Sequence, residues 1–261
     1  MMVIENWVKR ALHAGEKTSG AWLSLTNHIS AEIMAHAGFD WLLVDCEHGP
    51  TDIETLLSLL QAMSATRTVP FVRAPWNDIV VIKRILDVGA YGVMIPWVNN
   101  RAQAEDAVKA CKYPPRGLRG MAGPRATGYG RNFAEYIKRA NDEILVIVQI
   151  ETPEAVKNIE EILSVDGVDV AFIGPTDLSA LMNHPGDPGH PEVQAAIAQV
   201  EEAAKGANIA LGTISRSWEQ AKGLYDRGYQ FITLCSDASL IVQGSSEFAG
   251  KFAKEVRGPL N

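Results

Sequence analysis

Residues 41–74 carry the pattern that decides the fold, WLLVDCEHGPTDIETLLSLLQAMSATRTVPFVRA. Two apolar runs, WLLVDC (41–46) and PFVRA (70–74), flank a helix-like segment. The residues TDIE (51–54) have the form of a capping box, which marks a helix start. Both runs are nearly continuous in hydrophobicity instead of alternating, as in parallel strands that are buried on both faces. The stretch therefore predicts a strand, a helix and a second parallel strand.

Apolar runs of the same kind recur along the 261-residue chain. They are AWLSL (21–25), GVMIP (92–96), ILVIVQIE (144–151), VAFIG (170–174), IALGT (209–213) and FITLCS (231–236). Helix-like segments lie between most runs, without a linker or a change in composition. This alternation predicts a parallel sheet, and eight strands in about 250 residues favour a closed barrel. We expect an α/β fold, a (β/α)₈ TIM barrel, as a single domain over residues 1–261.

Helix boundaries support this division. Capping residues precede a proline at Thr152-Pro153 and His190-Pro191. Glycines end three helices just before a strand, at Gly38, Gly89 and Gly228. The stretch PPRGLRGMAGPRATGYGRN (114–132) is too irregular for either element and predicts a long loop, which in a compact domain is usually functional or disordered.

Charge and cysteine content exclude several classes of protein. The net charge of −7 disfavours a polyanion-binding surface, so we expect no nucleic-acid partner. The cysteines, at positions 46, 111 and 235, form no CxxC pair and no disulfide framework, which fits a reducing cytoplasm. Residues 1–20 are amphipathic and lack an apolar signal core, and no stretch has the roughly 18 apolar residues that span a bilayer. We expect a cytoplasmic protein without a membrane partner.

Barrels of this kind place the active site at the carboxyl ends of the strands. The polar residues there are Asp45, Glu47, His48, Arg73, Gln149, Glu151 and Asp177. Glu151 and Asp177 close neighbouring strands, so their carboxylates can converge on a Mg²⁺, Mn²⁺ or Co²⁺ ion. Such an ion stabilises the enolate of a 2-oxo acid. The alternative is that both acids only stabilise helix starts, since helix N-termini favour acids; their shared location favours the metal.

His48 is the best candidate base, because a histidine held by carboxylates near a metal can move protons at neutral pH. Arg73 lies inside an apolar run, where an unpaired guanidinium is costly to bury. We expect it to face a carboxylate or a developing enolate; the alternative is an internal ion pair with Asp45 or Glu47. None of the eleven lysines ends a strand, which disfavours an imine mechanism.

Four segments in the same order resemble the HpcH/HpaI aldolase family, and the resemblance runs through nearly the whole chain. They are FDWLLVDCEHGP (39–50), PFVRAPWND (70–78), LVIVQIETPEAVKNIEEIL (145–163) and VDVAFIGPTDLSALMNHPG (168–186). The resemblance implies a metal-dependent class II aldolase, a carbon-carbon lyase that forms and cleaves 4-hydroxy-2-oxo acids from pyruvate or hydroxypyruvate and an aldehyde. It implies that Glu151 and Asp177 bind the metal, and that His48, Arg73 and Asp45 are catalytic.

Further roles rest on the resemblance alone. Gln149 and the backbone around Gly174, Thr176 and Asp177 hold the 2-oxo acid, and Asp87 is lent by a neighbouring subunit to the histidine. The family assembles as hexamers with an exchanged C-terminal helix, which residues 238–256 could supply. The loop at 117–132, with Arg125 and Tyr129, is expected to meet the aldehyde. Two other readings stay open: a citrate-lyase-like enzyme acting on CoA thioesters, and a non-catalytic 2-oxo-acid-binding protein.

Overall fold

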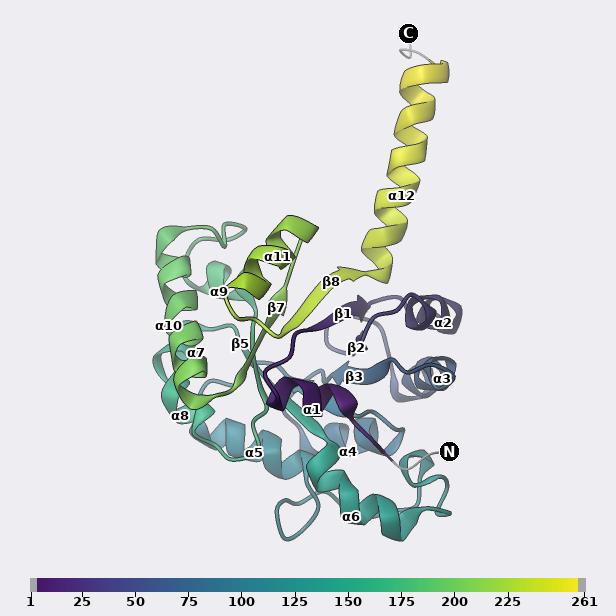
Figure 1. Ribbon diagram of the computed structural model, residues 1–261, viewed down its shortest axis with the longest axis vertical. Helices are drawn as coiled ribbons and strands as arrows, with labels where there is room; N and C mark the ends of the chain where they lie inside the picture. The colour runs from purple at the N-terminus through teal and green to yellow at the C-terminus, as the bar shows by residue number, and fades with distance from the viewer. Residues whose placement is uncertain (1–3, 258–261) are drawn as a thin grey trace.

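The computed structural model describes residues 4–257, so the ends of the predicted domain, residues 1–3 and 258–261, lie outside the described residues. Eight parallel strands close into one barrel in sequence order (Figure 1). They are β1 Thr18–Leu23, β2 Trp41–Asp45, β3 Val69–Arg73, β4 Gly92–Ile95, β5 Leu145–Ile150, β6 Val170–Ile173, β7 Ala210–Ile214 and β8 Phe231–Ser236. The predicted (β/α)₈ barrel is confirmed.

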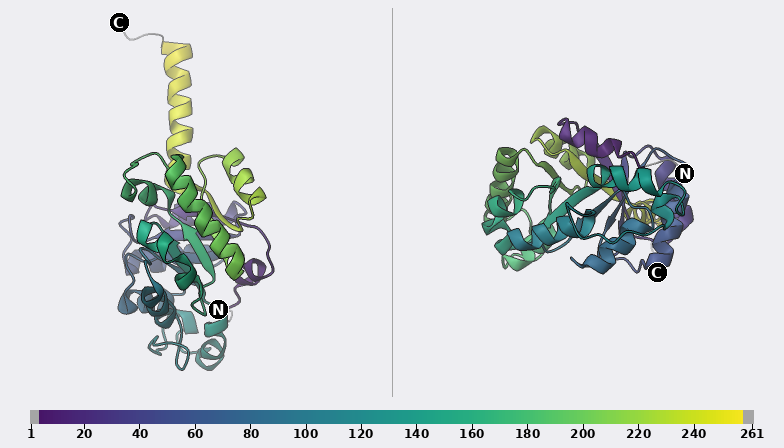
Figure 2. Two further views of the ribbon diagram at one scale, coloured as in Figure 1. Left: turned by 90° about the vertical axis from the view of Figure 1, so that its left-hand side faces the viewer. Right: turned by 90° about the horizontal axis from the view of Figure 1, so that it is seen from below.

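Helices surround the barrel, and the last of them extends away from it (Figures 1 and 2). They are α1 Trp7–His13, α2 His28–His36, α3 Ile53–Met63, α4 Ile79–Asp87, α5 Arg101–Cys111, α6 Phe133–Glu143, α7 Pro153–Lys157, α8 Ile159–Leu163, α9 Pro175–Leu181, α10 Pro191–Ala207, α11 Trp218–Asp226 and α12 Asp237–Phe252, with the short turns η1 Arg125–Thr127 and η2 Ala253–Arg257. Apolar side chains between the strands and the helices form the larger core cluster. The connection that leaves each strand therefore lies at one end of the barrel, and the connection that enters the next strand lies at the other.

The barrel interior is a second, smaller core cluster. Side chains alternate along each strand, so every second residue faces inward. Trp41 and Phe231 stack inside with their ring centroids 3.7 Å apart. Gly20 leaves room for the indole, because an added Cβ would lie 2.2 Å from the Trp41 ring. Stacked aromatic rings therefore fill much of the lower barrel interior.

Most predicted boundaries are confirmed, and two need correction. The first strand begins at Thr18 and ends at Leu23, earlier than the predicted 21–25, because the Ser24 N–H donates to the Asp237 carboxylate at 2.9 Å and not to a neighbouring strand. The predicted capping box is also wrong: Asp52 is the N-cap of α3, and its carboxylate accepts the Thr55 N–H at 2.8 Å. Thr152 and His190 cap their helices as predicted.

The loop predicted over residues 114–132 contains only the short turn η1. This turn packs against α4. Arg125 donates hydrogen bonds to the carbonyl oxygens of Val88 at 2.7 Å and Leu60 at 3.2 Å. Since α4 runs back from the carboxyl ends of the strands, its last residues lie at the amino-terminal face of the barrel. The loop therefore lies at the end opposite to the expected active site.

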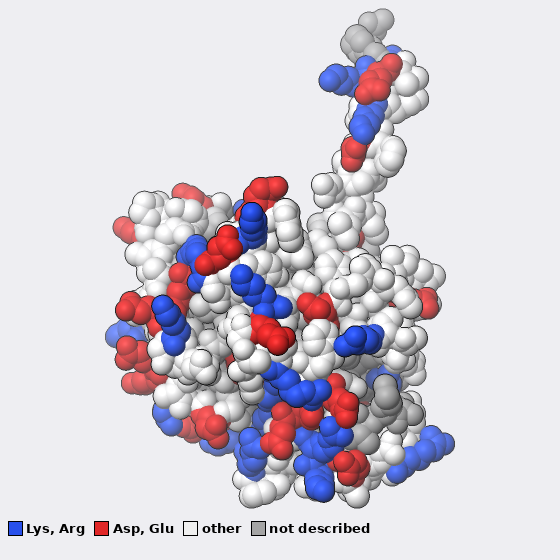
Figure 3. All heavy atoms as spheres, in the orientation of Figure 1, with Lys and Arg blue, Asp and Glu red and all other residues white. Residues whose placement is uncertain are grey.

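Helix α12 continues from β8 and extends away from the barrel (Figures 1 and 2). Its exposed apolar residues include Ile241, Val242 and Phe248, the last with 74% of its surface exposed. Figure 3 shows that charged residues cover the barrel in both signs, whereas the lower part of α12 is nearly free of them. Within residues 4–257, no helix is long and apolar enough to cross a membrane.

Candidate active site

The alternation that fills the barrel interior with aromatic rings also selects the residues above them. Asp45 and Arg73 follow the inward-facing Leu43 and Phe71 by two positions, and they are register partners of one another. Gln149 follows the inward-facing Ile147 in the same way. The polar side chains at these strand ends therefore form the top layer of the barrel interior.

Arg73 is held on three sides in this layer. Its Nε and Nη2 donate to the two oxygens of Asp45 at 2.9 and 2.6 Å, and its Nη1 lies 3.1 Å from Oε2 of Glu47. Its guanidinium stacks on the Trp22 ring, 4.4 Å from the centroid. The internal ion pair considered as an alternative is thus present. Arg73 still lines the pocket described below, so the pair positions the guanidinium and does not remove it from the site.

The Asp45 carboxylate stays charged in this setting. Burial alone would raise the pKa of Asp45, but hydrogen bonds and charge from Arg73 outweigh burial and bring this pKa below its ordinary value. The backbone N–H groups of Glu47 and His48 also donate to Asp45 Oδ1, at 3.0 and 3.3 Å. Asp45 therefore fixes both Arg73 and the turn that carries His48.

His48 lies at the rim of the site. Its side chain is 67% exposed, and its Nε2 is 4.0 Å from Oε2 of Glu47. Burial raises the pKa of Glu47, although the charges of Arg73 and His48 oppose this. The imidazole is therefore accessible to a bound molecule and has a carboxylate beside it.

Glu151 is the most deeply buried acid of the site, with 1% of its surface exposed. The Trp97 backbone N–H donates to its Oε1 at 2.9 Å, and the Gln149 amide donates to its Oε2. Burial raises the pKa of Glu151 to about 7, and the negative charges of Glu47 and Asp177 add to the effect. Although the charge of Arg73 opposes this rise, the carboxyl group is close to losing its charge at neutral pH when no metal ion is bound.

Residues 174–177 close the other side of the site. Position 174 requires glycine because Glu151 lies close by: an added Cβ would lie 2.8 Å from Glu151 Oε2. Asp177 lies in the first turn of α9, yet its carboxylate makes no hydrogen bond or ion pair with any residue from 4 to 257. Asp177 therefore does not cap α9 through a hydrogen bond, although its place in the first turn still suits the alternative role of stabilising the helix start by its charge.

These side chains surround a pocket of about 340 Å³. Its lining includes Trp22, His48, Arg73, Gln149, Phe172, Gly174, Pro175, Thr176, Asp177 and Ile214. The residues fit a divalent metal: Glu151 and Asp177 offer carboxylate oxygens, and the buried Gln149 Oε1 accepts no hydrogen bond from the described residues. A hard cation would compensate the charge that burial disfavours on Glu151.

Comparison with known proteins agrees with this geometry. The family description HpcH/HpaI aldolase/citrate lyase matches residues 18–244. This chain belongs to that family. A 4-hydroxy-2-oxo-heptane-1,7-dioate aldolase from Shigella sonnei (strain Ss046) is 44% identical over 254 residues, 97% of each chain. The prediction of an aldolase of the HpcH/HpaI family is confirmed at this level.

Two solved structures of similar chains carry the same barrel. An HpcH/HpaI aldolase/citrate lyase family protein from Burkholderia cenocepacia J2315 has a TM-score of 0.92 and 37% identity, with 97% of this chain and 100% of that one covered. A citrate synthase has a TM-score of 0.85 and 28% identity, with 93% and 96% covered. Because proteins of this fold are named for different reactions, the site has to decide the chemistry.

Two predicted contributors of the HpcH/HpaI site lie elsewhere in this chain. Asp87 ends α4 at the amino-terminal face, where its Oδ1 accepts a hydrogen bond from Arg119 Nη2 at 2.9 Å. Arg125 and its loop lie at the same face, so the expectation that this loop meets the aldehyde is wrong within one chain. The reason is connectivity: residues 112–132 follow α5 and lead through α6 to β5, so they lie at the end of the barrel opposite the site.

Trp22 and Trp97 contribute to the site but were not predicted. Trp22 stacks on Arg73, and the Trp97 backbone donates to Glu151 from a conformation with φ of 55°. Trp22 occupies an inward position of the first apolar run, and Trp97 directly follows the fourth. An aromatic residue at the end of a predicted strand is the feature that could have indicated these roles. In the sequence, however, such a residue cannot be distinguished from an ordinary core residue.

Proposed function

We propose that this protein is a divalent-metal-dependent aldolase that forms and cleaves 4-hydroxy-2-oxo acids from pyruvate or hydroxypyruvate and an aldehyde. The observation that carries the proposal is that two acids, Glu151 and Asp177, interact electrostatically at a pocket that the fixed guanidinium of Arg73 also lines. Negative and positive groups side by side suit a metal ion and an anionic 2-oxo acid together. The family's relatives that are named as aldolases support the same reaction class.

Glu151 and Asp177 would hold the metal. When bound, a divalent ion polarises the keto oxygen and stabilises negative charge on it. The sequence and the structure leave Mg²⁺, Mn²⁺ and Co²⁺ as candidates, since all accept carboxylate oxygen ligands. Gln149 would orient Glu151 through its amide, which already donates to that carboxylate.

Arg73 would bind the oxygens of the 2-oxo acid and stabilise the enolate charge. Its two bonds to Asp45 fix the plane of the guanidinium, and its Nη1 is paired with Glu47, so a bound 2-oxo acid would approach a guanidinium of fixed orientation. The backbone around Gly174, Thr176 and Asp177 would hold the carboxylate of the 2-oxo acid at the start of α9. Gly174 allows close approach because it has no Cβ.

His48 would move the proton of the methyl carbon. It is exposed to the pocket and sits on a turn that Asp45 fixes through two backbone hydrogen bonds. A base held this way can take a proton from the 2-oxo acid in one direction and return it in the other.

The lysines of the chain argue against an imine. Burial lowers the pKa of Lys112 to about 8, which is the property expected of an imine-forming lysine. However, its ammonium donates to the carbonyl oxygens of Asn141 and Ile144 at 2.8 Å, before β5 begins. It therefore lies at the opposite end of the barrel.

Borohydride treatment in the presence of pyruvate should trap no adduct; a trapped adduct would contradict the metal mechanism.

Asp87 and α12 would act through other copies of the chain. We propose a homo-hexamer in which α12 is exchanged and Asp87 of one copy approaches His48 of another. In support, Asp87 is remote from His48 in its own chain, and α12 leaves Ile241, Val242 and Phe248 uncovered.

Size-exclusion chromatography with light scattering should show the hexamer in the full chain and smaller species in V242D or F248D. A monomeric full chain would overturn this part. A cytoplasmic location stays a prediction.

The experiment that tests the function is a screen of 2-oxo acids against aldehydes with metal-free protein and with protein reloaded with Mg²⁺, Mn²⁺ or Co²⁺. Product should form only with metal. A second arm adds acetyl-CoA or a malyl thioester, and turnover there instead would favour the citrate-lyase-like alternative. Binding of pyruvate without exchange of its methyl protons would favour a non-catalytic 2-oxo-acid-binding protein.

A further inference from the structure

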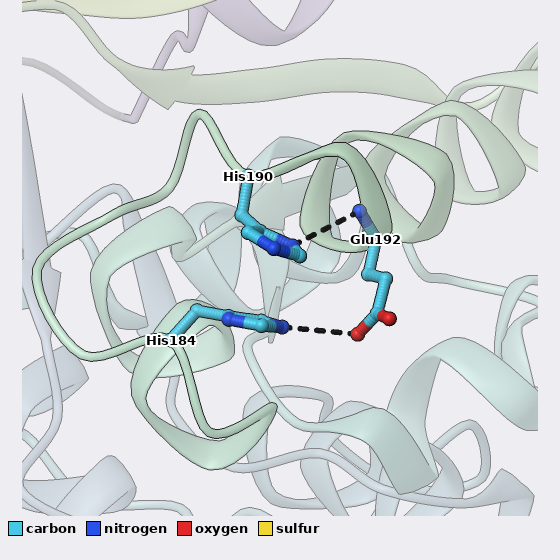
Figure 4. Close-up of side chains that lie close together, drawn as sticks. All are labelled: His184, His190 and Glu192. Carbon is cyan, nitrogen blue, oxygen red and sulfur yellow. Dashed lines mark hydrogen bonds and ion pairs between the residues drawn. The ribbon is translucent and has the colours of Figure 1, made fainter.

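Two histidines and a glutamate gather in the connection between α9 and α10, outside the pocket described above. His184 follows α9, His190 is the N-cap of α10, and Glu192 lies in the first turn of α10 (Figure 4). One ligand atom from each of the three side chains lies within 4.8 Å of the other two. The connection follows β6, so the cluster is at the same end of the barrel as the candidate active site.

The three side chains are already in contact. His184 Nε2 lies 2.9 Å from Glu192 Oε2, and the two imidazole rings stack with centroids 3.4 Å apart and planes 16° apart (Figure 4). The Glu192 backbone N–H donates to His190 Nδ1 over a long 3.3 Å. Neutral imidazole nitrogens bind transition-metal ions, so each of the two rings can offer a ligand atom.

We propose that His184, His190 and Glu192 form a second metal site that takes Zn²⁺ or a similar transition-metal ion. Two histidines and one glutamate are a known ligand set for zinc, with water at the fourth position. Imidazole ligands select against Mg²⁺, which prefers oxygen. The Glu192 side chain is 69% exposed and the His184 side chain 22% exposed, so an ion can enter and a water can complete its shell.

Binding requires a small rearrangement. Ligand atoms about 2.0 to 2.2 Å from a tetrahedral ion are about 3.3 Å apart, closer than the 4.8 Å limit within which these atoms lie. The lone pair of an imidazole nitrogen lies in the ring plane, so the stacked rings must turn until their nitrogens converge. The only described hydrogen bond that His190 then gives up is the long one from the Glu192 backbone.

The ion would connect the two helices that follow β6. The His184 backbone N–H donates to the carbonyl oxygen of Ser179 in α9, and Glu192 belongs to α10. Asp177 begins the same helix α9. Zinc at this site would therefore fix the end of the short helix whose first turn carries a proposed catalytic-metal ligand.

The test uses the full chain without an affinity tag, in an E151Q/D177N background that removes the proposed catalytic-metal ligands. Equilibrium dialysis against buffered Zn²⁺ should give one ion per chain in this background. Introducing H184A, H190A or E192Q into this background should lower the zinc affinity by more than about 10-fold. Even substitutions of residues that only hydrogen-bond to a metal ligand cost that much. H36A, which alters an exposed histidine on α2, is the matched control and should bind as the background does.

A second readout does not depend on affinity. Co²⁺ bound in place of zinc should give the visible absorption of a tetrahedral site, which H184A should abolish and H36A should keep. Circular dichroism and thermal melts of each variant without metal show that the fold is retained. No bound zinc in the background protein, or equal binding by H184A and H36A, would overturn the proposal. Because the background lacks Glu151 and Asp177, the outcome is independent of the proposed aldolase function.

Discussion

The buried Glu151 carboxyl group makes metal-free protein lose stability as the pH rises. In the unfolded chain this group ionises near its ordinary pKa of 4.5, whereas burial raises the pKa in the folded chain to about 7. Between these values the folded state binds more protons than the unfolded state, so stability falls as pH increases. A difference of about 2.5 pKa units corresponds to about 3 kcal/mol, fully expressed above pH 7. Below pH 4.5 the effect is absent.

The substitution E151Q removes this penalty. A glutamine cannot ionise, and its amide can still accept from the Trp97 N–H and donate to Gln149 Oε1, which has no partner among the described residues. At pH 8 in EDTA, E151Q should be more stable than the wild type by up to about 3 kcal/mol, and at pH 5 by less than about 1 kcal/mol. Guanidinium denaturation at a fixed protein concentration measures both differences.

Two controls sharpen this experiment. E154Q changes an exposed acid in the first turn of α7 and should not become more stable at pH 8. Adding Mg²⁺ or Mn²⁺ at pH 8 should stabilise the wild type but not E151Q, because the ion compensates the charge only where it exists. If E151Q is no more stable than the wild type in EDTA at pH 8, Glu151 does not carry the buried charge assigned to it.

Three further predictions concern the rest of the site. D177A should weaken Mn²⁺ binding at least about 10-fold while E160Q, at an exposed position of α8, leaves it unchanged; equal affinities would mean that Asp177 is no ligand. G174A should also weaken metal binding, because its Cβ would lie 2.8 Å from Glu151 Oε2. Calorimetry with Mn²⁺ measures this affinity, and a G174A affinity equal to that of the wild type would contradict the prediction. R73K keeps the charge but loses the two-point contact with Asp45, so kcat should fall about 10²- to 10³-fold with a higher KM for the 2-oxo acid; unchanged kinetics would exclude a positioned guanidinium.

The periodicity of the chain was sufficient to predict the barrel. Parallel strands buried on both faces are continuous in hydrophobicity, and the predicted strand ends differ from those in the structure by at most three residues. The same pattern placed Asp45, Arg73, Gln149 and Glu151 at the strand ends, because the polar residue that closes an apolar run must lie at the barrel mouth. Asp177 was found through its position after β6.

Other features depend on contacts that sequence spacing does not specify. The ion pair between Arg73 and Asp45 requires the register of β2 and β3, which brings these residues side by side. Trp97 contributes a backbone N–H, which every non-proline residue has. The position of the loop that carries Arg125 could not be predicted either, because glycine- and arginine-rich composition indicates a loop but not the end of the barrel that the loop covers.

Exchange of the pyruvate methyl protons for deuterium tests the central claim most directly, because it measures enolisation without an aldehyde. Proton NMR should show exchange by the wild type with Mg²⁺ and none after EDTA treatment. H48A should retain metal and pyruvate binding but exchange about 10²- to 10⁴-fold more slowly, while H36A exchanges like the wild type. Exchange at the wild-type rate by EDTA-treated protein or by H48A would contradict metal-dependent enolisation with His48 as the base.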